Sequence, residues 1–494
     1  MNKDPVLVLQ MQRMGDLILS FPLLAKLLEA YPGHPLWVVG EQSFFEPLLP
    51  LSPQATYFSY TNAPDLRGHT FAAVINLSFR PEAAALAGLA KTDLLVGPWL
   101  NKRGRMFIKG QWQLYRASLT HNNRYNRYHW ADLNTLDALP PPLALRPDWP
   151  LPRPLTRSDS EGSEGSRIGL FLGASEPEKH PDAPFWANLA KVLLKAGHKP
   201  VLLGGEGEKA LGQTTASLIG APHLNLTGRF SVAALAQFIR ELDLLITPDT
   251  GPMHIAANLG TPVLNLSMGP VNPWETGPAS PGHHILRPDL DCAGCWRCTQ
   301  ENARCRDTFT HAKVASVAAW LLAPQEPQGR ISMQRRTHGL ELLCTGRDEY
   351  GLYSLQSLIG PRTGSGPDAG GGPENLPETL ARPALSRFWQ AWFGALFGLF
   401  SQEAPGRAWQ ELRDFHPQAA QTLTGSAAAL ALALAKTFRA NPTAILSTPE
   451  FWEQAHPLAR PLSGYIQMYA QNEQGSRQAV MHALSLAEQV AELV

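Results

Sequence analysis

The stretch "TPDTGPMHIAANLGTPVLNL" (Thr247–Leu266) predicts a strand end, a tight loop, a helix and the next strand. Pro252 is favoured in the first turn of a helix, and Gly251 lets a ligand approach the backbone closely. The unpaired amides and positive dipole end of such a helix bind anions, and they suit a pyrophosphate. His254, on the same first turn, can reach that anion. An ordinary strand–loop–helix connection capped by Asp249 is the alternative.

The alternation of apolar runs and helical segments extends to both sides of this stretch. The later runs are RIGLFLGA (167–174), PVLLGG (200–205), LNLTG (224–228), LLITPDT (244–250) and PVLNLS (262–267). The earlier runs are VLVLQ (6–10), LWVVG (36–40), AAVINL (72–77) and DLLVG (93–97). Strands that are apolar throughout and separated by helices indicate parallel sheets covered on both faces. We therefore predict an α/β protein with two doubly wound, Rossmann-like domains that face a ligand-binding cleft.

Changes in composition divide the chain into segments. We expect a Rossmann-like domain over 1–145, a Pro-rich and then Ser/Gly-rich linker over 146–166, and a second Rossmann-like domain over 167–324. A short β element and a Gly-rich linker follow over 325–378, and a mostly helical extension without an assigned role follows over 379–494. The extension contains the uncharged aromatic run FWQAWFGALFGLF, which we expect in a helical core; contact with a membrane surface is the alternative.

Two other strand ends of the second domain carry polar residues. Ser175 and Lys179 follow its first strand, where a hydroxyl and a cation suit a phosphate. Glu206 or Glu208 follows the next strand and could hold ribose hydroxyls. Taken singly, a solvated surface lysine and a turn with a charged helical start are the alternatives. No Walker-type lysine loop and no G-x-G-x-x-G dinucleotide motif occur in the sequence.

Near the N-terminus, the helix that begins in RMGDLILSFPLL carries Asp16 in its first turn, directly after the first apolar run. An acidic residue there is either a cap or a reactive carboxylate at the mouth of a site. The helix start favours the anion, so the second role would be that of a base at neutral pH.

Four of the five cysteines are close together, in a C-x2-C-x2-C-x6-C pattern. They are Cys292, Cys295, Cys298 and Cys305. Four thiolates at this spacing can hold a tetrahedral Zn²⁺ or an iron ion, and four reduced thiols in a loop are the alternative.

Composition excludes several classes of protein. Lys plus Arg and Asp plus Glu both number 42, so the chain lacks the positive charge of a general nucleic-acid binder. The first residues contain no leader pattern, and no apolar run approaches the ~20 residues of a membrane span. We therefore expect a cytoplasmic enzyme.

Three segments in this order resemble glycosyltransferase family 9, the ADP-heptose-dependent heptosyltransferases, which have a GT-B fold. They are "MGDLILSFPLLAKL", the strand, small-residue loop, Lys and Phe-Trp segment that ends at Trp186, and "PDTGPMHIAANLGTPV". The resemblance covers about residues 1–323. It implies inverting transfer of heptose from ADP-heptose to a lipopolysaccharide core acceptor, without a cofactor for the transfer, at the inner face of the inner membrane.

The resemblance also implies roles for individual residues. Asp16 matches the family's catalytic base on the acceptor side. On the donor side, the implied phosphate contacts are Ser175, Lys179, Thr250 and Gly251; the sugar-diphosphate contacts are Asp249 and His254; the ribose contact is Glu206 or Glu208; and the adenine contact is Phe230. Ala174 departs from the hydroxyl residue common in relatives, so contact there would be through the backbone.

Two alternatives accompany this hypothesis. The chain could be a protein O-heptosyltransferase, because related protein heptosyltransferases carry an iron-binding cysteine finger and this chain has both a cysteine cluster and a helical extension. It could also be a GT-B module that binds a nucleotide sugar without catalysis.

Overall fold

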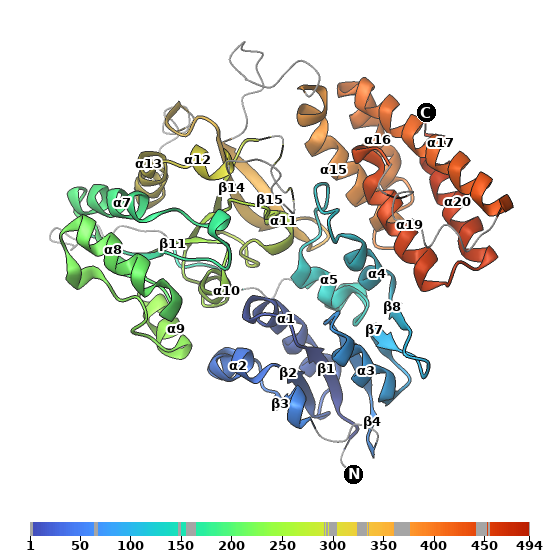
Figure 1. The fold of residues 1–494 in the computed structure, drawn as a ribbon, viewed down its shortest axis with the longest axis horizontal. Helices are drawn as coiled ribbons and strands as arrows, with labels where there is room; N and C mark the ends of the chain where they lie inside the picture. Colours follow the sequence, from blue (N-terminus) through green and yellow to red (C-terminus); the bar gives the residue numbers. More distant parts are fainter. Residues whose placement is uncertain are drawn as a thin grey trace.

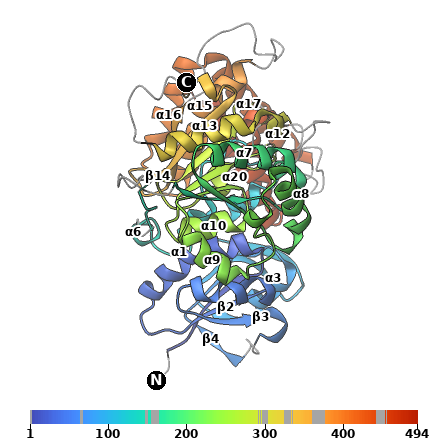
Figure 2. The same ribbon diagram turned by 90° about the vertical axis from the view of Figure 1, so that its left-hand side faces the viewer.

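The computed structural model describes most of the chain (Figure 1). The described residues are 3–63, 68–146, 150–154, 165–290, 292, 295, 304–323, 333, 335–359, 376–440, 452 and 455–493. They form two α/β units, each built on its own sheet, and a group of C-terminal helices (Figures 1 and 2).

The first unit contains a six-stranded sheet in the order β3-β2-β1-β5-β7-β8. Its strands are β1 (Val6–Gln10), β2 (Leu36–Gly40), β3 (Thr56–Ser59), β5 (Ala73–Asn76), β7 (Leu95–Leu100) and β8 (Met106–Lys109). All neighbours pair in parallel except β7 and β8. The central strand β1 is buried throughout, as a strand covered on both faces must be. A separate pair joins β4 (Thr70–Phe71) to β6 (Lys91–Thr92).

The second unit contains a seven-stranded sheet in the order β10-β9-β11-β12-β13-β14-β15. Its parallel strands are β9 (Arg167–Phe171), β10 (Lys199–Leu203), β11 (Leu244–Pro248), β12 (Val263–Leu266) and β13 (His284–Pro288). The antiparallel strands β14 (Leu340–Arg347) and β15 (Tyr353–Ile359) extend the same sheet. The short β element expected within 325–378 is therefore an edge of the second sheet. The two sheets with their helices confirm the predicted pair of α/β units.

One expected strand is absent from the second sheet. In the run LNLTG (224–228), only an isolated bridge joins Asn225 to Leu202. The Asn225 side chain accepts hydrogen bonds from the backbone N–H of Thr227 at 3.0 Å and from its hydroxyl at 2.7 Å. This local turn competes with a strand ladder, so the prediction of a strand was wrong here.

Helices cover both sheets. In the first unit they are α1 (Met14–Ala30), α2 (Gln42–Phe45), α3 (Pro81–Leu89), α4 (Gln111–Ser118), α5 (Trp130–Leu136) and α6 (Pro141–Ala144). In the second unit they are α7 (Ala183–Lys195), α8 (Lys209–Ile219), α9 (Val232–Arg240), α10 (Gly251–Asn258), α11 (Pro273–Thr276), α12 (Arg304–Thr308) and α13 (His311–Leu322). Short 3-10 helices include Pro177–Lys179 and Glu206–Glu208.

The C-terminal helices pack against the first unit (Figure 1). They are α15 (Leu376–Leu396), α16 (Ala404–Phe415), α17 (Pro417–Ala440), α19 (Arg460–Asn472) and α20 (Arg477–Ala491). α19 contacts α4 and β8, and the Asn472 side chain accepts from the Ile108 N–H at 2.7 Å. Phe388, Trp389 and Phe393 are buried, which confirms the expected helical core. In the described part of the chain, no helix is both long and apolar enough to cross a membrane.

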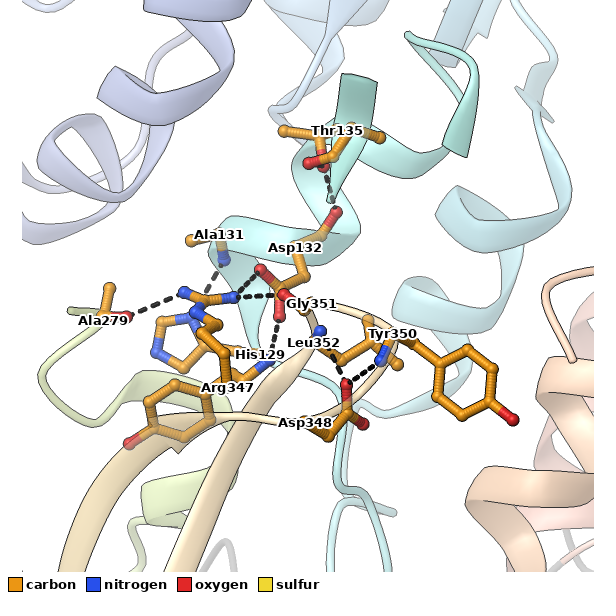
Figure 3. Close-up of polar contacts among 12 residues, drawn as sticks. His129, Ala131, Asp132, Thr135, Ala279, Arg347, Asp348, Tyr350, Gly351 and Leu352 are labelled. Atoms are coloured by element: carbon orange, nitrogen blue, oxygen red, sulfur yellow. Dashed lines mark hydrogen bonds and ion pairs between the residues drawn. The ribbon is translucent and has the colours of Figure 1, made fainter. Parts of the chain in front are cut away.

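A buried ion pair fastens the β14–β15 hairpin of the second unit to α5 of the first (Figure 3). The Arg347 guanidinium donates to Asp132 Oδ1 at 2.6 Å and to the carbonyl of Ala279 at 2.8 Å. The other carboxylate oxygen of Asp132 accepts from the Tyr353 N–H at 2.7 Å. The side chains of Arg347 and Asp132 are only 9% and 4% exposed. The two units are thus joined by buried polar contacts as well as by apolar packing.

Candidate functional site

A cavity of about 840 Å³ lies between the two units, next to the N-terminal ends of α1 and α10. α1 and α10 contact each other, and a Cβ atom added to Gly15 would lie 3.2 Å from the ring of His254. The cavity is lined by residues of both units; those with polar side chains are Arg13, Asp16, Asn123, Trp130, Ser175, Glu176, Lys179, Asp249, Thr250, His254, Asn272, Glu275 and Thr276. It therefore brings the predicted catalytic residue and six of the nine predicted donor-binding residues together at the carboxyl ends of β1, β9 and β11.

Asp16 lies on the first turn of α1 and lines the cavity from the side of the first unit. The N-cap of this helix is Arg13, so Asp16 is not the N-cap. Burial raises the pKa of the Asp16 carboxyl, while the Arg116 charge and hydrogen bonds from backbone amides oppose this shift. The helix start was expected to favour the anion, but desolvation outweighs it here. A raised pKa makes this carboxylate a stronger base once it is ionised.

Arg116 of α4 supplies a buried positive charge behind Asp16. Its guanidinium donates to Asn134 Oδ1 at 3.0 Å and stacks over the Trp130 ring at 5.1 Å from the ring centroid. Burial lowers the pKa of Arg116, and the charges of Asp16 and Glu275 raise it. A guanidinium remains charged at neutral pH, so it stabilises the ionised form of Asp16.

Lys179 and Ser175 face Asp16 from the second unit. The Lys179 side chain is 17% exposed, and its ammonium lies 3.3 Å from a carboxylate oxygen of Glu176. The Ser175 hydroxyl accepts from Arg13 across the cavity at 3.4 Å. Two cations from different units therefore lie beside a hydroxyl, a combination suited to a phosphate group.

The predicted anion site at the start of α10 also opens into this cavity. Thr250 is the N-cap of the helix, and its side chain makes no capping hydrogen bond. Asp249 accepts from the Thr276 hydroxyl at 3.1 Å, and burial raises the pKa of Asp249 to about 6 despite the nearby Lys179 charge. Burial lowers the pKa of His254 to about 3, so its imidazole is neutral at neutral pH. His254 can thus approach an anion only as a neutral hydrogen-bonding group.

Three predicted donor contacts do not line the cavity. The Glu206 carboxylate is largely exposed and pairs with Lys209 at 2.6 Å. Glu208 instead accepts from the Gly205 N–H at 2.7 Å, and a Cβ atom on Gly173 would meet its carboxylate. Phe230 packs on Phe238, with 5.1 Å between the ring centroids.

The cysteine cluster is only partly within the described residues, since Cys298 lies outside them. The sulfur of Cys305 accepts from the Gly269 N–H at 3.3 Å. Among the residues that the structure describes, no group of three or more His, Cys, Asp or Glu side chains is placed to hold a metal ion. The spacing of the four cysteines predicts about one zinc or iron ion per chain. Elemental analysis of protein prepared under reducing conditions measures the zinc and iron content per chain. Absence of both metals would contradict this prediction.

Sequence reasoning missed Arg116, Asn123 and Glu275, which are all buried beside or in the cavity. Glu275 follows Asn272 and Pro273, so in the sequence it has the pattern of an ordinary acidic first turn. Only the packing of the two units shows that this carboxyl faces Arg116 and accepts hydrogen bonds from the first unit.

Comparisons with known proteins agree with the resemblance. Residues 63–305 match the family described as glycosyltransferase family 9 (heptosyltransferase). Lipopolysaccharide heptosyltransferase 1 of Pseudomonas aeruginosa is 31% identical over 205 residues, which are 36% of this chain and 56% of that protein. Lipopolysaccharide core heptosyltransferase OpsX of Haemophilus influenzae is 25% identical over 294 residues, which are 55% of this chain and 80% of that protein. The chain thus spans little more than half the length of the first of these relatives.

Among solved structures, the E. coli ADP-heptose lps heptosyltransferase II is similar to this chain with a TM-score of 0.48 and 22% sequence identity. The match covers 64% of this chain and 98% of the E. coli protein.

Proposed function

The chain carries a glycosyltransferase family 9 domain, and on that premise we propose that it transfers a heptose from ADP-heptose to a hydroxyl group of a lipopolysaccharide core. The observation that carries this proposal is the cavity between the units. It joins a partly buried carboxyl of the first unit, Asp16, to Lys179 and to the start of α10 in the second unit. A hydroxyl acceptor and a sugar diphosphate require these two kinds of group on opposite sides of the reacting carbon.

In this proposal Asp16 is the general base. Its carboxylate takes the proton of the acceptor hydroxyl as the hydroxyl oxygen attacks the anomeric carbon of the heptose. The bond from that carbon to the diphosphate oxygen breaks, and ADP leaves. One displacement with one base inverts the anomeric configuration.

The departing diphosphate is the proposed ligand of the second unit. The Lys179 ammonium, the Ser175 hydroxyl and the backbone amides at Thr250 and Gly251 would stabilise its negative charge. Asp249 and neutral His254 would contact the sugar-diphosphate region of the donor. Glu206 or Glu208 and Phe230 remain the proposed contacts of the ribose and adenine, beyond the cavity that the structure outlines.

We expect ADP and ADP-heptose to raise the thermal unfolding temperature of the protein more than UDP or GDP do. A ligand that binds only the folded state stabilises it by about 2.7 kcal/mol when its concentration is 100 times Kd. Differential scanning fluorimetry measures the shift. Lys179→Ala should weaken the effect of ADP, because it removes a cation from the diphosphate. Equal shifts with UDP and ADP would contradict the ADP assignment.

A further inference from the structure

The short helix α11 of the second unit carries a carboxyl that is bound by the first unit. Glu275 Oε2 accepts from Asn123 Nδ2 at 2.7 Å, and its Oε1 accepts from Asn126 Nδ2 at 3.1 Å. The Asn272 side chain donates back to the carbonyls of Asn123 and Asn126, at 2.8 and 3.2 Å. We call these four residues the Asn–Glu bridge. Each is at most 3% exposed, so the bridge is a buried contact between the units.

The bridge lies in the wall of the cavity, next to the residues of the proposed reaction. Asn123, Asn272 and Glu275 all line it. The residue after Glu275, Thr276, donates to Asp249. α11 therefore contacts a loop of the first unit through Glu275 and the end of β11 through Thr276.

The charged and titratable groups that face Glu275 come from both units. The positive charge of Arg116 on α4 lowers the pKa of Glu275, and the negative charge of Asp249 at the end of β11 raises it. The charge of Glu275 in turn raises the pKa of Tyr115 on α4. The charges of Asp16 and Glu275 both raise the pKa of Arg116, against the lowering by burial. The Tyr115 hydroxyl donates to Asn126 Oδ1 at 2.9 Å, so the Asn–Glu bridge also contacts the helix that carries Arg116.

We propose that Glu275 is a positioning residue for the transfer: it fastens residues 123–126 to α11, and so it holds Asp16 of the first unit opposite the diphosphate site of the second unit. This inference rests on the proposed function for its chemistry, and on the Asn–Glu bridge alone for its geometry.

Glu275 does this as a neutral acid near neutral pH. Burial raises its pKa to about 8, although the hydrogen bonds from Asn123 and Asn126 and the Arg116 charge oppose the shift. Asn123 Oδ1 is buried and has no hydrogen-bond partner among the described residues. If the side-chain amide of Asn123 is flipped by 180°, its Oδ1 accepts a hydrogen bond from the O–H of protonated Glu275. While Glu275 is neutral, the Arg116 charge stabilises only the ionised form of Asp16. Once Glu275 ionises, its carboxylate also attracts Arg116, and its negative charge opposes binding of the diphosphate in the cavity.

The experiment compares wild type, Glu275→Ala and Glu275→Gln, with Glu341→Gln as a control for loss of a partly buried carboxyl elsewhere in the second unit. Glu341 lies on β14, where it pairs with Arg287 at 3.5 Å. We expect Glu275→Ala to lower kcat by about 10²-fold, because a small misplacement of a reacting group has an effect of that size, with ADP affinity unchanged. Glu275→Gln should recover most of this loss at pH 7. Wild type and Glu341→Gln should lose kcat/KM above pH 8, and Glu275→Gln should not.

Amide hydrogen exchange supplies a readout that needs no activity. Peptides that cover residues 121–127 should exchange faster in Glu275→Ala than in wild type or Glu341→Gln. Unchanged exchange there, an unchanged kcat in Glu275→Ala, or an alkaline loss of kcat/KM that persists in Glu275→Gln would overturn the positioning role. Absence of heptose transfer by the wild type would instead overturn the proposed function, and the exchange result would still decide whether Glu275 fastens the loop.

Discussion

Asp16→Asn should lower the rate of heptose transfer by about 10²–10⁴-fold, the usual contribution of a positioned general base. Asparagine keeps the size of the side chain and an oxygen for the backbone amide at the start of α1, so the fold should be preserved. It cannot accept the proton of the acceptor hydroxyl. Steady-state transfer from ADP-heptose, at saturating concentrations of both substrates, measures the loss.

ADP binding separates this role from a structural one. The affinity of Asp16→Asn for ADP should equal or exceed that of wild type, because the substitution removes a negative charge from the cavity. Lys179→Ala is the matched comparison: it removes a positive charge from the cavity, so its affinity for ADP should be lower than that of wild type. If Asp16→Asn transfers heptose at the wild-type rate, Asp16 is not the general base.

The second large effect concerns stability. Asp132→Ala should lower the free energy of unfolding by about 3–5 kcal/mol, because it leaves the buried Arg347 charge without its carboxylate. The same change removes the acceptor of the Tyr353 N–H. Urea denaturation measures the loss. Since Asp132 and Arg347 join the two units, the transition should also become less cooperative.

An exposed ion pair provides the matched control for this substitution. Glu403 pairs with Arg407 at 3.6 Å, and both side chains are mostly solvent-exposed. Glu403→Ala should cost at most about 1 kcal/mol, as is usual for such pairs. A similar small loss in Asp132→Ala would show that the contact drawn in Figure 3 does not hold the two units together.

The sequence predicted the layered part of the fold well, because period and apolarity determine which segments become buried strands. β1, β9 and β11 lie where continuous apolar runs predict them, and α10 begins at the Gly251-Pro252 pair. It also predicted that Asp16, Lys179 and Asp249 follow neighbouring strand ends, and the structure brings these residues to one cavity.

The contacts between the units could not be predicted in this way. Glu275 and Arg116 are far apart in sequence, and nothing in either local pattern distinguishes a buried partner from a solvated charge. The desolvation that raises the pKa of Asp16 is likewise a result of tertiary packing. At LNLTG, a side-chain turn at Asn225 prevailed over an apolar pattern that is typical of a strand.

The anomeric configuration of the transferred sugar tests the central claim most directly. Purified protein is incubated with ADP-heptose and a heptose-deficient lipopolysaccharide core, and NMR of the product gives the configuration at the new linkage. A single displacement assisted by Asp16 predicts one added heptose with an anomeric configuration opposite to that in the donor, and one ADP released per transfer. A product that retains the donor configuration would contradict it.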